Sequence, residues 1–262
     1  MSRYERAVQT WQGWQVRSAA DIDQHLDSFR ILFAYHSGKI ENSEITYHDT
    51  REIFENGKVS GYTGSPWTLF EQQNQKLCYE VLKGKIADRE PISMELVREV
   101  HCILTSGTYD ERRYIDNGER PGEFKKHDYV TGIHEVGSAP EDVEPDLQEL
   151  IQEVNEIGRS APLKAGAYLH ACFEAIHPFA DGNGRVGRAL LNYWLMANDY
   201  PPTIIFDEDK QSYYRALQLY DEQDDIAPLA EFLEQQTVKT WDRAMALTEG
   251  QPQERRGLTE FL

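Results

Sequence analysis

Apolar residues recur at intervals of three and four positions through most of this chain. Ile22, Leu26, Phe29 and Phe33, for example, are spaced by 4, 3 and 4 residues, and the same spacing returns in later segments. This period puts the apolar side chains on one face of an α-helix, so the helices must pack together to bury those faces. A chain of 262 residues is long enough to build such a core. The sequence therefore predicts an all-α fold.

Capping residues mark where the helices begin. Ser18, Thr46 and Ser93 stand before apolar periodic segments, and Ser65 is followed by a proline suited to a first helical turn. We predict helices at about residues 22–33, 47–57, 66–81, 93–107, 143–158, 162–176, 185–198, 210–220 and 226–246.

The helical period lapses between residues 108 and 139. Within this stretch, residues 126–138 contain Tyr129, Val130 and Ile133 with Gly132. Aromatic and β-branched residues around a glycine are typical of a short β-hairpin. We therefore expect one small hairpin, a flap, in an otherwise helical fold.

Charge and composition exclude several classes of partner. The formal net charge of −18 repels phosphates, so we expect no nucleic-acid partner. No apolar run approaches the roughly 18 residues of a membrane span, and the first residues do not resemble a signal peptide. We therefore expect a cytoplasmic protein with no membrane partner. Any anionic ligand needs a local cluster of Arg, Lys and backbone N–H groups.

Cysteine spacing gives no sign of a disulfide framework. The three cysteines, Cys78, Cys102 and Cys172, lie far apart among apolar neighbours. We expect buried free thiols.

That cluster of cationic groups is found in the polar break between the helices predicted at 162–176 and 185–198. Residues 177–188 read HPFADGNGRVGR. Gly-Asn-Gly can turn successive N–H groups inward as an anion-binding nest at a helix N-terminus. Arg185 and Arg188 are neighbours on one helix face and can each contact phosphate oxygens with two N–H groups. Asp181 is a hard oxygen ligand for Mg²⁺, and His177 can accept a proton near neutral pH.

Each part of this break has an ordinary structural interpretation when taken alone. A lone histidine is usually structural, and a DGNG string is usually a turn. A base, an acid, a nest and two arginines within residues 177–188 favour a phosphate and metal site with a general base. Other chemistry is not supported: His170 and His177 lack a third zinc ligand, and no P-loop motif occurs. His101, His127 and His170 are interpreted as core or surface histidines.

The string HPFADGNGRVGR resembles the HxFx(D/E)GNGRxxR signature of the Fic (Fido) family at every defined position. The resemblance extends over residues 93–236 and implies a Fic-type helical bundle that transfers AMP from ATP to a protein hydroxyl. It implies that His177 deprotonates that hydroxyl and that Phe179 anchors the loop in the core. Asp181 would hold Mg²⁺ against the phosphates.

The resemblance also implies a phosphate site. Gly182, Asn183 and Gly184 would form the anion hole, and Arg185 and Arg188 would hold the β- and γ-phosphates. Most of the catalysis would then be positioning and charge stabilisation.

A later segment resembles the lining of the family's adenine pocket, through Tyr213, Tyr214, Leu217 and Asp221. Asparagine is common in the family where Asp221 stands here. For Tyr213 and Leu217, plain helix packing is an equal alternative. The flap at about 126–138 would dock a target protein by strand pairing.

Residues 37–42, SGKIEN, fit an (S/T)xxxE(G/N) helix whose glutamate occupies the γ-phosphate site in related proteins. The motif lies N-terminal to the core, as in the class that carries its own inhibitor. Alone, the string would be a solvated helix end; its place after the helix at 22–33 favours an inhibitory role for Ser37, Glu41 and Asn42. Ser37 lies one turn before Glu41 and could hydrogen-bond its carboxylate.

The chain divides by sequence into three parts. We expect an N-terminal helical region at 1–92, a Fic core at 93–238, and a helix end and tail at 239–262. Self-modification and a homo-oligomer are left open.

The leading hypothesis is a protein adenylyltransferase with ATP as substrate and Mg²⁺ as cofactor, inhibited by Glu41. One alternative is removal of AMP from a modified protein by the same site. Another is a non-catalytic ATP-binding module, which needs neither the base His177 nor the ligand Asp181.

Overall fold

Helices account for most of the residues that the computed structural model describes, which are 1–129 and 137–248. Ten α-helices lie in this part of the chain: α1 Arg3–Gly13, α2 Ala19–Glu41, α3 Tyr47–Asn56, α4 Pro66–Ala87, α5 Met94–Thr105, α6 Val143–Ile157, α7 Pro162–Ile176, α8 Asn183–Ala197, α9 Lys210–Gln223 and α10 Ala227–Thr248. Short helical turns are η1 Arg112–Asp116, η2 Gly158–Ser160 and η3 Asp207–Asp209. The all-α prediction is confirmed for these residues.

The predicted caps begin the helices as expected. The side chains of Ser18, Thr46 and Ser93 each accept a hydrogen bond from the backbone N–H three residues later. Helix α2 is longer than the periodic segment 22–33 and continues to Glu41, so residues 37–41 form its last turn. Gly38 in this turn packs closely against α4, because a Cβ there would meet the side-chain ends of Gln72 and Ile45 and these would have to shift.

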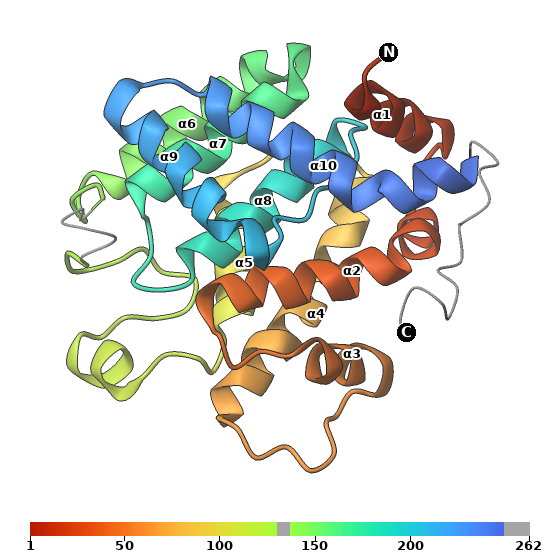
Figure 1. Cartoon of the computed structure of the whole chain (residues 1–262). Helices are drawn as coiled ribbons and strands as arrows, with labels where there is room; N and C mark the ends of the chain where they lie inside the picture. Colours follow the sequence, from red (N-terminus) through yellow and green to blue (C-terminus); the bar gives the residue numbers. More distant parts are fainter. Residues whose placement is uncertain (130–136, 249–262) are drawn as a thin grey trace.

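Helix α8 lies at the centre of the bundle (Figure 1). Almost all of its residues are buried, and α2, α4, α5 and α7 pack against it. Helix α10 packs on α1, α7 and α9. One buried apolar cluster extends from Ala7 on α1 to Met245 on α10, so the regions 1–92 and 93–238 share a core.

The described residues contain no strand. The hairpin predicted at 126–138 falls largely on residues 130–136, which lie outside the described residues. The lapse in period that begins at residue 108 contains the π-helical turn η1.

The cysteine prediction is wrong at one position. Cys78 is buried and Cys172 is partly buried, but Cys102 is exposed because it lies on the outer face of α5. Among the described helices, none is both long and apolar enough for a bilayer span.

Candidate active site

The loop between α7 and α8 begins where the backbone turns left-handed. His177 has φ 50° and ψ 61°, a conformation that L-residues adopt infrequently and that ends α7 at Ile176. Gly182 also has a positive φ of 82° and is the N-cap of α8. A Cβ at this glycine would approach the Thr105 methyl group. The loop thus places His177 close to the N-terminus of α8.

Asn183 closes this loop with its side chain. Its Oδ1 accepts the Phe179 N–H at 2.9 Å, and its Nδ2 donates to the Phe179 carbonyl at 2.7 Å. Asn183 and Gly184 already belong to α8, so Gly182 is the member of the Gly-Asn-Gly string with a positive φ. The backbone N–H groups at this end of α8 form a helix N-terminus, which favours an anion.

His101 on α5 packs against the loop between α7 and α8, a role that the sequence did not reveal. Its ring stacks on the fully buried Phe179 with 3.6 Å between centroids. Its Nδ1 accepts the Gly122 N–H at 2.8 Å, so its Nε2 carries the proton and lies 3.1 Å from the Asp181 carbonyl. Burial lowers the pKa of His101 to about 3, which keeps this tautomer neutral. A histidine on the apolar face of α5, beside Val97 and Leu104, was the available signal, because a buried polar side chain needs partners.

His177 is half-buried and uncharged at neutral pH. Burial, aided by the Lys125 ammonium, lowers the pKa of His177 to about 4. A neutral imidazole is the form that can accept a proton.

The two ends of the predicted flap are tied to the residues beside His177. The Lys125 N–H donates to the Pro178 carbonyl and the Ser138 N–H to the Ile176 carbonyl, each at 2.9 Å. The predicted flap therefore begins and ends beside His177, the predicted general base. Docking of a target by residues 126–138 stays a prediction.

Arg185 and Arg188 follow in the first turns of α8, and both are buried. Arg188 donates from Nε to the Ser37 hydroxyl at 3.0 Å and from one terminal nitrogen to the Ser37 carbonyl at 2.9 Å. The same nitrogen lies 2.7 Å from Oε1 of Glu41. Ser37 was expected to bond the Glu41 carboxylate; the structure shows its hydroxyl accepting from Arg188. The last turn of α2 is thus fastened to α8.

The Glu41 carboxylate lies directly against Gly184. A Cβ on residue 184 would collide with Glu41 Oε1, so glycine permits this close approach. Residues 37–42 and the loop 177–188, far apart in sequence, therefore meet in one site.

Arg185 lies between two other carboxylates. One terminal nitrogen is 3.3 Å from Glu71 Oε1 on α4, and the other is 3.3 Å from Asp181 Oδ2. The second oxygen of Glu71 accepts from the Asn42 amide at 2.9 Å. Glu71 was not identified from the sequence, because it belongs to neither motif.

The residues predicted to line an adenine pocket do not all face the same way. Tyr213 is buried in the core, and its hydroxyl lies 2.7 Å from His170 Nε2. Helix α9 turns Tyr213 toward α7, where it packs in the core. Tyr214 and Asp221 are exposed and Leu217 is half-buried. The adenine contacts stay a prediction for all four residues.

Glu174 is a second acid in this region that sequence reasoning missed. Its Oε1 is buried, has no hydrogen-bond partner among residues 1–129 and 137–248, and lies beside Gly187. Burial raises the pKa of Glu174 to about 7; Glu41 and Asp221 add to the rise, and Arg188 opposes it. The signal was its position on α7, one turn before His177.

Asp181 fits the metal role proposed from the sequence. Its side chain is partly exposed and stands beside Arg185 at the start of α8. Mg²⁺ usually takes one or two protein carboxylates and completes its shell with phosphate and water oxygens, so a single carboxylate suffices here. The one group of three metal-ligating side chains found within residues 1–129 and 137–248 is His36, Asp207 and Glu208. There Asp207 is hydrogen-bonded to His36 and Glu208 pairs with Lys239, so these three side chains have partners within the fold.

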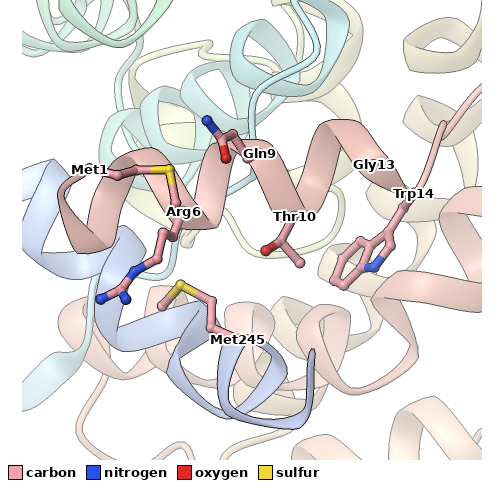
Figure 2. A pocket seen from close by; sticks show the side chains of 7 residues that line it. All are labelled: Met1, Arg6, Gln9, Thr10, Gly13, Trp14 and Met245. Carbon is pink, nitrogen blue, oxygen red and sulfur yellow. The ribbon is translucent and has the colours of Figure 1, made fainter. Parts of the chain in front are cut away.

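A cavity of about 470 Å³ opens between α1 and α10, well away from the loop. Figure 2 shows its lining side chains, among them Arg6, Trp14 and Met245. None of its lining residues belongs to the predicted site. The cavity lacks the base, acid and paired arginines that the loop brings together.

Comparison with known sequences gives an independent result. Residues 91–195 match the sequence model of the Fic/DOC family. Over 227 residues the chain is 30% identical to "Protein adenylyltransferase Fic" of Drosophila persimilis, covering 84% of this chain and 42% of that protein. The match to the Drosophila melanogaster protein has the same identity and covers 43% of it. The chain therefore spans less than half the length of these curated relatives.

Solved structures share the fold. A Fic domain-containing signaling protein from Bacteroides thetaiotaomicron has a TM-score of 0.82 and 25% identity, covering 98% of this chain and all (100%) of that one. Fic-1 from C. elegans has a TM-score of 0.76 at 21% identity, covering 95% of this chain and 73% of that structure. The sequence match, the common helical fold and the signature loop show that residues 91–195 of this chain are a domain of the Fic/DOC family.

Proposed function

We propose that this chain transfers AMP from ATP to a hydroxyl group of a target protein, and that Glu41 holds this activity low. The observation that carries the proposal is the loop after α7. It places a neutral His177 beside a helix N-terminus that bears two buried arginines. Nucleophilic attack on a phosphate ester requires a general base next to positively charged groups that bind the phosphate oxygens.

The residues divide the work of the reaction. The triphosphate lies at the N-terminus of α8, where the backbone N–H groups, Arg185 and Arg188 bind its oxygens. His177 accepts the proton of the target hydroxyl as its oxygen bonds to the α-phosphorus. The bond from that phosphorus to the pyrophosphate oxygen breaks, and pyrophosphate leaves. Asp181 would hold Mg²⁺, which neutralises phosphate charge when bound.

The Glu41 carboxylate and the γ-phosphate are anions that suit the same guanidinium. Arg188 contacts Glu41 at 2.7 Å and also donates a hydrogen bond to the Ser37 hydroxyl. Burial alone would lower the pKa of Arg188, but the neighbouring Glu41 raises it, so the pair is stabilised as charged partners. While Glu41 occupies Arg188, a triphosphate is pushed into a pose unfit for in-line attack. A misplacement of about 1 Å can cost on the order of a hundredfold in rate.

Labelling with α-labelled ATP tests both parts. We expect low incorporation in the wild type, about a hundredfold more in Glu41→Gly, and low incorporation again in Glu41→Gly/Arg188→Ala. Glu44→Gly is a matched control, because Glu44 is an exposed glutamate just after the inhibitory segment. Equal labelling by wild type and Glu41→Gly would reject inhibition by Glu41.

The same experiment separates the alternatives. Release of AMP from pre-labelled protein by the wild type, lost in Glu41→Gly, would identify AMP removal as the main activity. ATP binding without any transfer in Glu41→Gly would identify a nucleotide-binding module.

A further inference from the structure

Glu71 connects the inhibitory segment to the phosphate site through a path that avoids Arg188. It lies on α4, and each of its carboxylate oxygens contacts a different motif. Oε2 accepts from the amide of Asn42, the last residue of the inhibitory segment, at 2.9 Å. Oε1 lies 3.3 Å from the first signature arginine, Arg185. The Asn42 amide also reaches the Thr68 hydroxyl at 3.2 Å, which fixes it against α4.

The two signature arginines are thus matched with two carboxylates from different helices. Arg188 pairs with Glu41 on α2, and Arg185 pairs with Glu71 on α4. Glu71 is the more buried acid, with 16% of its side chain exposed against 38% for Glu41. A charge pair shielded from water is stronger and harder to replace than an exposed one.

The guanidinium of Arg185 is shared between Glu71 and Asp181, each at 3.3 Å. Asp181 is the carboxylate that the proposed function gives to Mg²⁺. A cation and a guanidinium compete for one carboxylate, so metal binding is easier when another acid retains Arg185. Within the described residues, Glu71 is the other acid that forms an ion pair with Arg185.

We propose that Glu71 is a positioning residue for Arg185: it holds the guanidinium away from full pairing with Asp181 and so keeps Asp181 available to the metal. Asn42 orients Glu71, which links the end of α2 to this second arginine. This inference rests on the proposed ATP and Mg²⁺ site, and it goes beyond it by giving α4 a part in metal use. Without Glu71, Arg185 would pair with Asp181 alone and compete with Mg²⁺.

The same arrangement has an opposite effect on metal-free nucleotide. The Glu71 carboxylate also competes with phosphate oxygens for Arg185. Removing the charge of Glu71 leaves Asp181 as the one carboxylate that competes with ATP for Arg185 among the described residues, so metal-free ATP should bind more tightly. A residue that merely supports the fold would weaken ATP binding under both conditions or change neither.

The test measures binding, so it does not depend on transfer. In a Glu41→Gly parent, ATP is titrated by calorimetry with a chelator present, and then Mg²⁺ is titrated at fixed ATP. For Glu71→Gln we expect ATP without metal to bind several-fold more tightly. We expect the Mg²⁺ concentration at half-saturation, the midpoint, to rise about tenfold. Asn42→Ala should shift both quantities in the same directions by less. Glu80→Gln removes an acid from the same helix, where Glu80 pairs with Arg30 and Lys83, and serves as the control.

Thermal unfolding of each variant checks that it is folded. A Mg²⁺ midpoint equal to that of the parent would overturn the inference, as would a loss of ATP affinity with and without metal. If Glu71→Gln does not fold, Asn42→Ala decides alone by the same two readouts. Binding without transfer in the Glu41→Gly parent would reject the proposed reaction and leave the role of Glu71 decided by the midpoints. A parent that binds no ATP would overturn both.

Discussion

The two sides of α8 differ in how they hold their side chains. On the α2 side, formed by Ser37, Glu41 and Asn42, Arg188 makes three contacts of 2.7 to 3.0 Å with the last turn of α2. On the α9 side, formed by Tyr214, Leu217 and Asp221, Tyr214 is 47% exposed. Tyr213, the neighbouring aromatic, is turned into the core against His170.

This difference separates side chains that are held within the protein from side chains that are open to a ligand. The α2 side buries a cationic side chain, which requires an anionic partner before any ligand arrives. The α9 side presents partly exposed side chains whose partner would be the ligand. Substitutions of Ser37 or Glu41, the two residues of the α2 side that contact Arg188, should therefore raise activity. Substitutions on the α9 side should lower it.

The largest expected effect is on AMP transfer and follows from substitution of His177, which belongs to neither side. In a Glu41→Gly background, His177→Ala should lower transfer about 10²- to 10⁴-fold, because it removes the general base. ATP affinity should stay near that of the parent, since neither side of α8 is altered. Labelling beside ATP titration measures both quantities. Intact transfer would remove His177 from the role of base and show that binding alone supports the reaction.

A pair of single substitutions tests the opposite signs. Ser37→Ala removes the hydroxyl that accepts from Arg188 Nε, so Glu41 is held less firmly and labelling should rise several-fold, up to about tenfold. Tyr214→Ala removes an exposed ring from the α9 side. If this ring stacks on the adenine of ATP, the change should weaken ATP binding by about tenfold.

Ser43→Ala is the matched control for the first change, since Ser43 is exposed just beyond the inhibitory segment. The comparison between the sides would fail if both variants moved activity in the same direction.

The smallest effect is on the free energy of unfolding and concerns Glu174, a buried acid of α7 near Arg188. Its pKa is raised from 4.5 to about 7, chiefly by burial, so the native state binds more protons than the unfolded state between those values. Stability from this group is therefore fully present below about pH 4.5 and is lost as pH rises toward 7. Glu174→Gln should be more stable than wild type by roughly 1–3 kcal/mol at pH 8, with little difference at pH 5.

The groups that face Glu174 are Arg188 on α8, Glu41 on α2 and Asp221 on α9, together with His170 and Tyr213. Urea unfolding at both pH values measures the difference. Glu149→Gln on the exposed face of α6 is the control. A stabilisation of the Gln variant that is equal at both pH values would show that Glu174 does not titrate in this window.

Helices α2 to α10 and the loop could be predicted from local sequence, because their signals are short-range; helix α1, Arg3–Gly13, was not predicted. Caps at Ser18, Thr46 and Ser93 lie within three residues of the N–H groups that they accept. The residues that support the loop could not be predicted in the same way. Glu71 is separated from Arg185 by 114 positions and His101 from Asp181 by 80, so their roles depend on how α4 and α5 pack.

The sequence by itself determined the order of capped helices and the run of base, acid, glycines and arginines at 177–188. A helical period and a left-handed turn need only neighbouring residues. The family resemblance already implied that Glu41 lies beside Arg188, whereas only the tertiary structure showed that Glu71 meets Arg185. Glu41 and Arg188 are 147 positions apart, and they meet at 2.7 Å because α2 and α8 bury their faces against each other. The buried arginines then required acids from whichever helices the packing brought near, because an unpaired buried charge is too costly to keep.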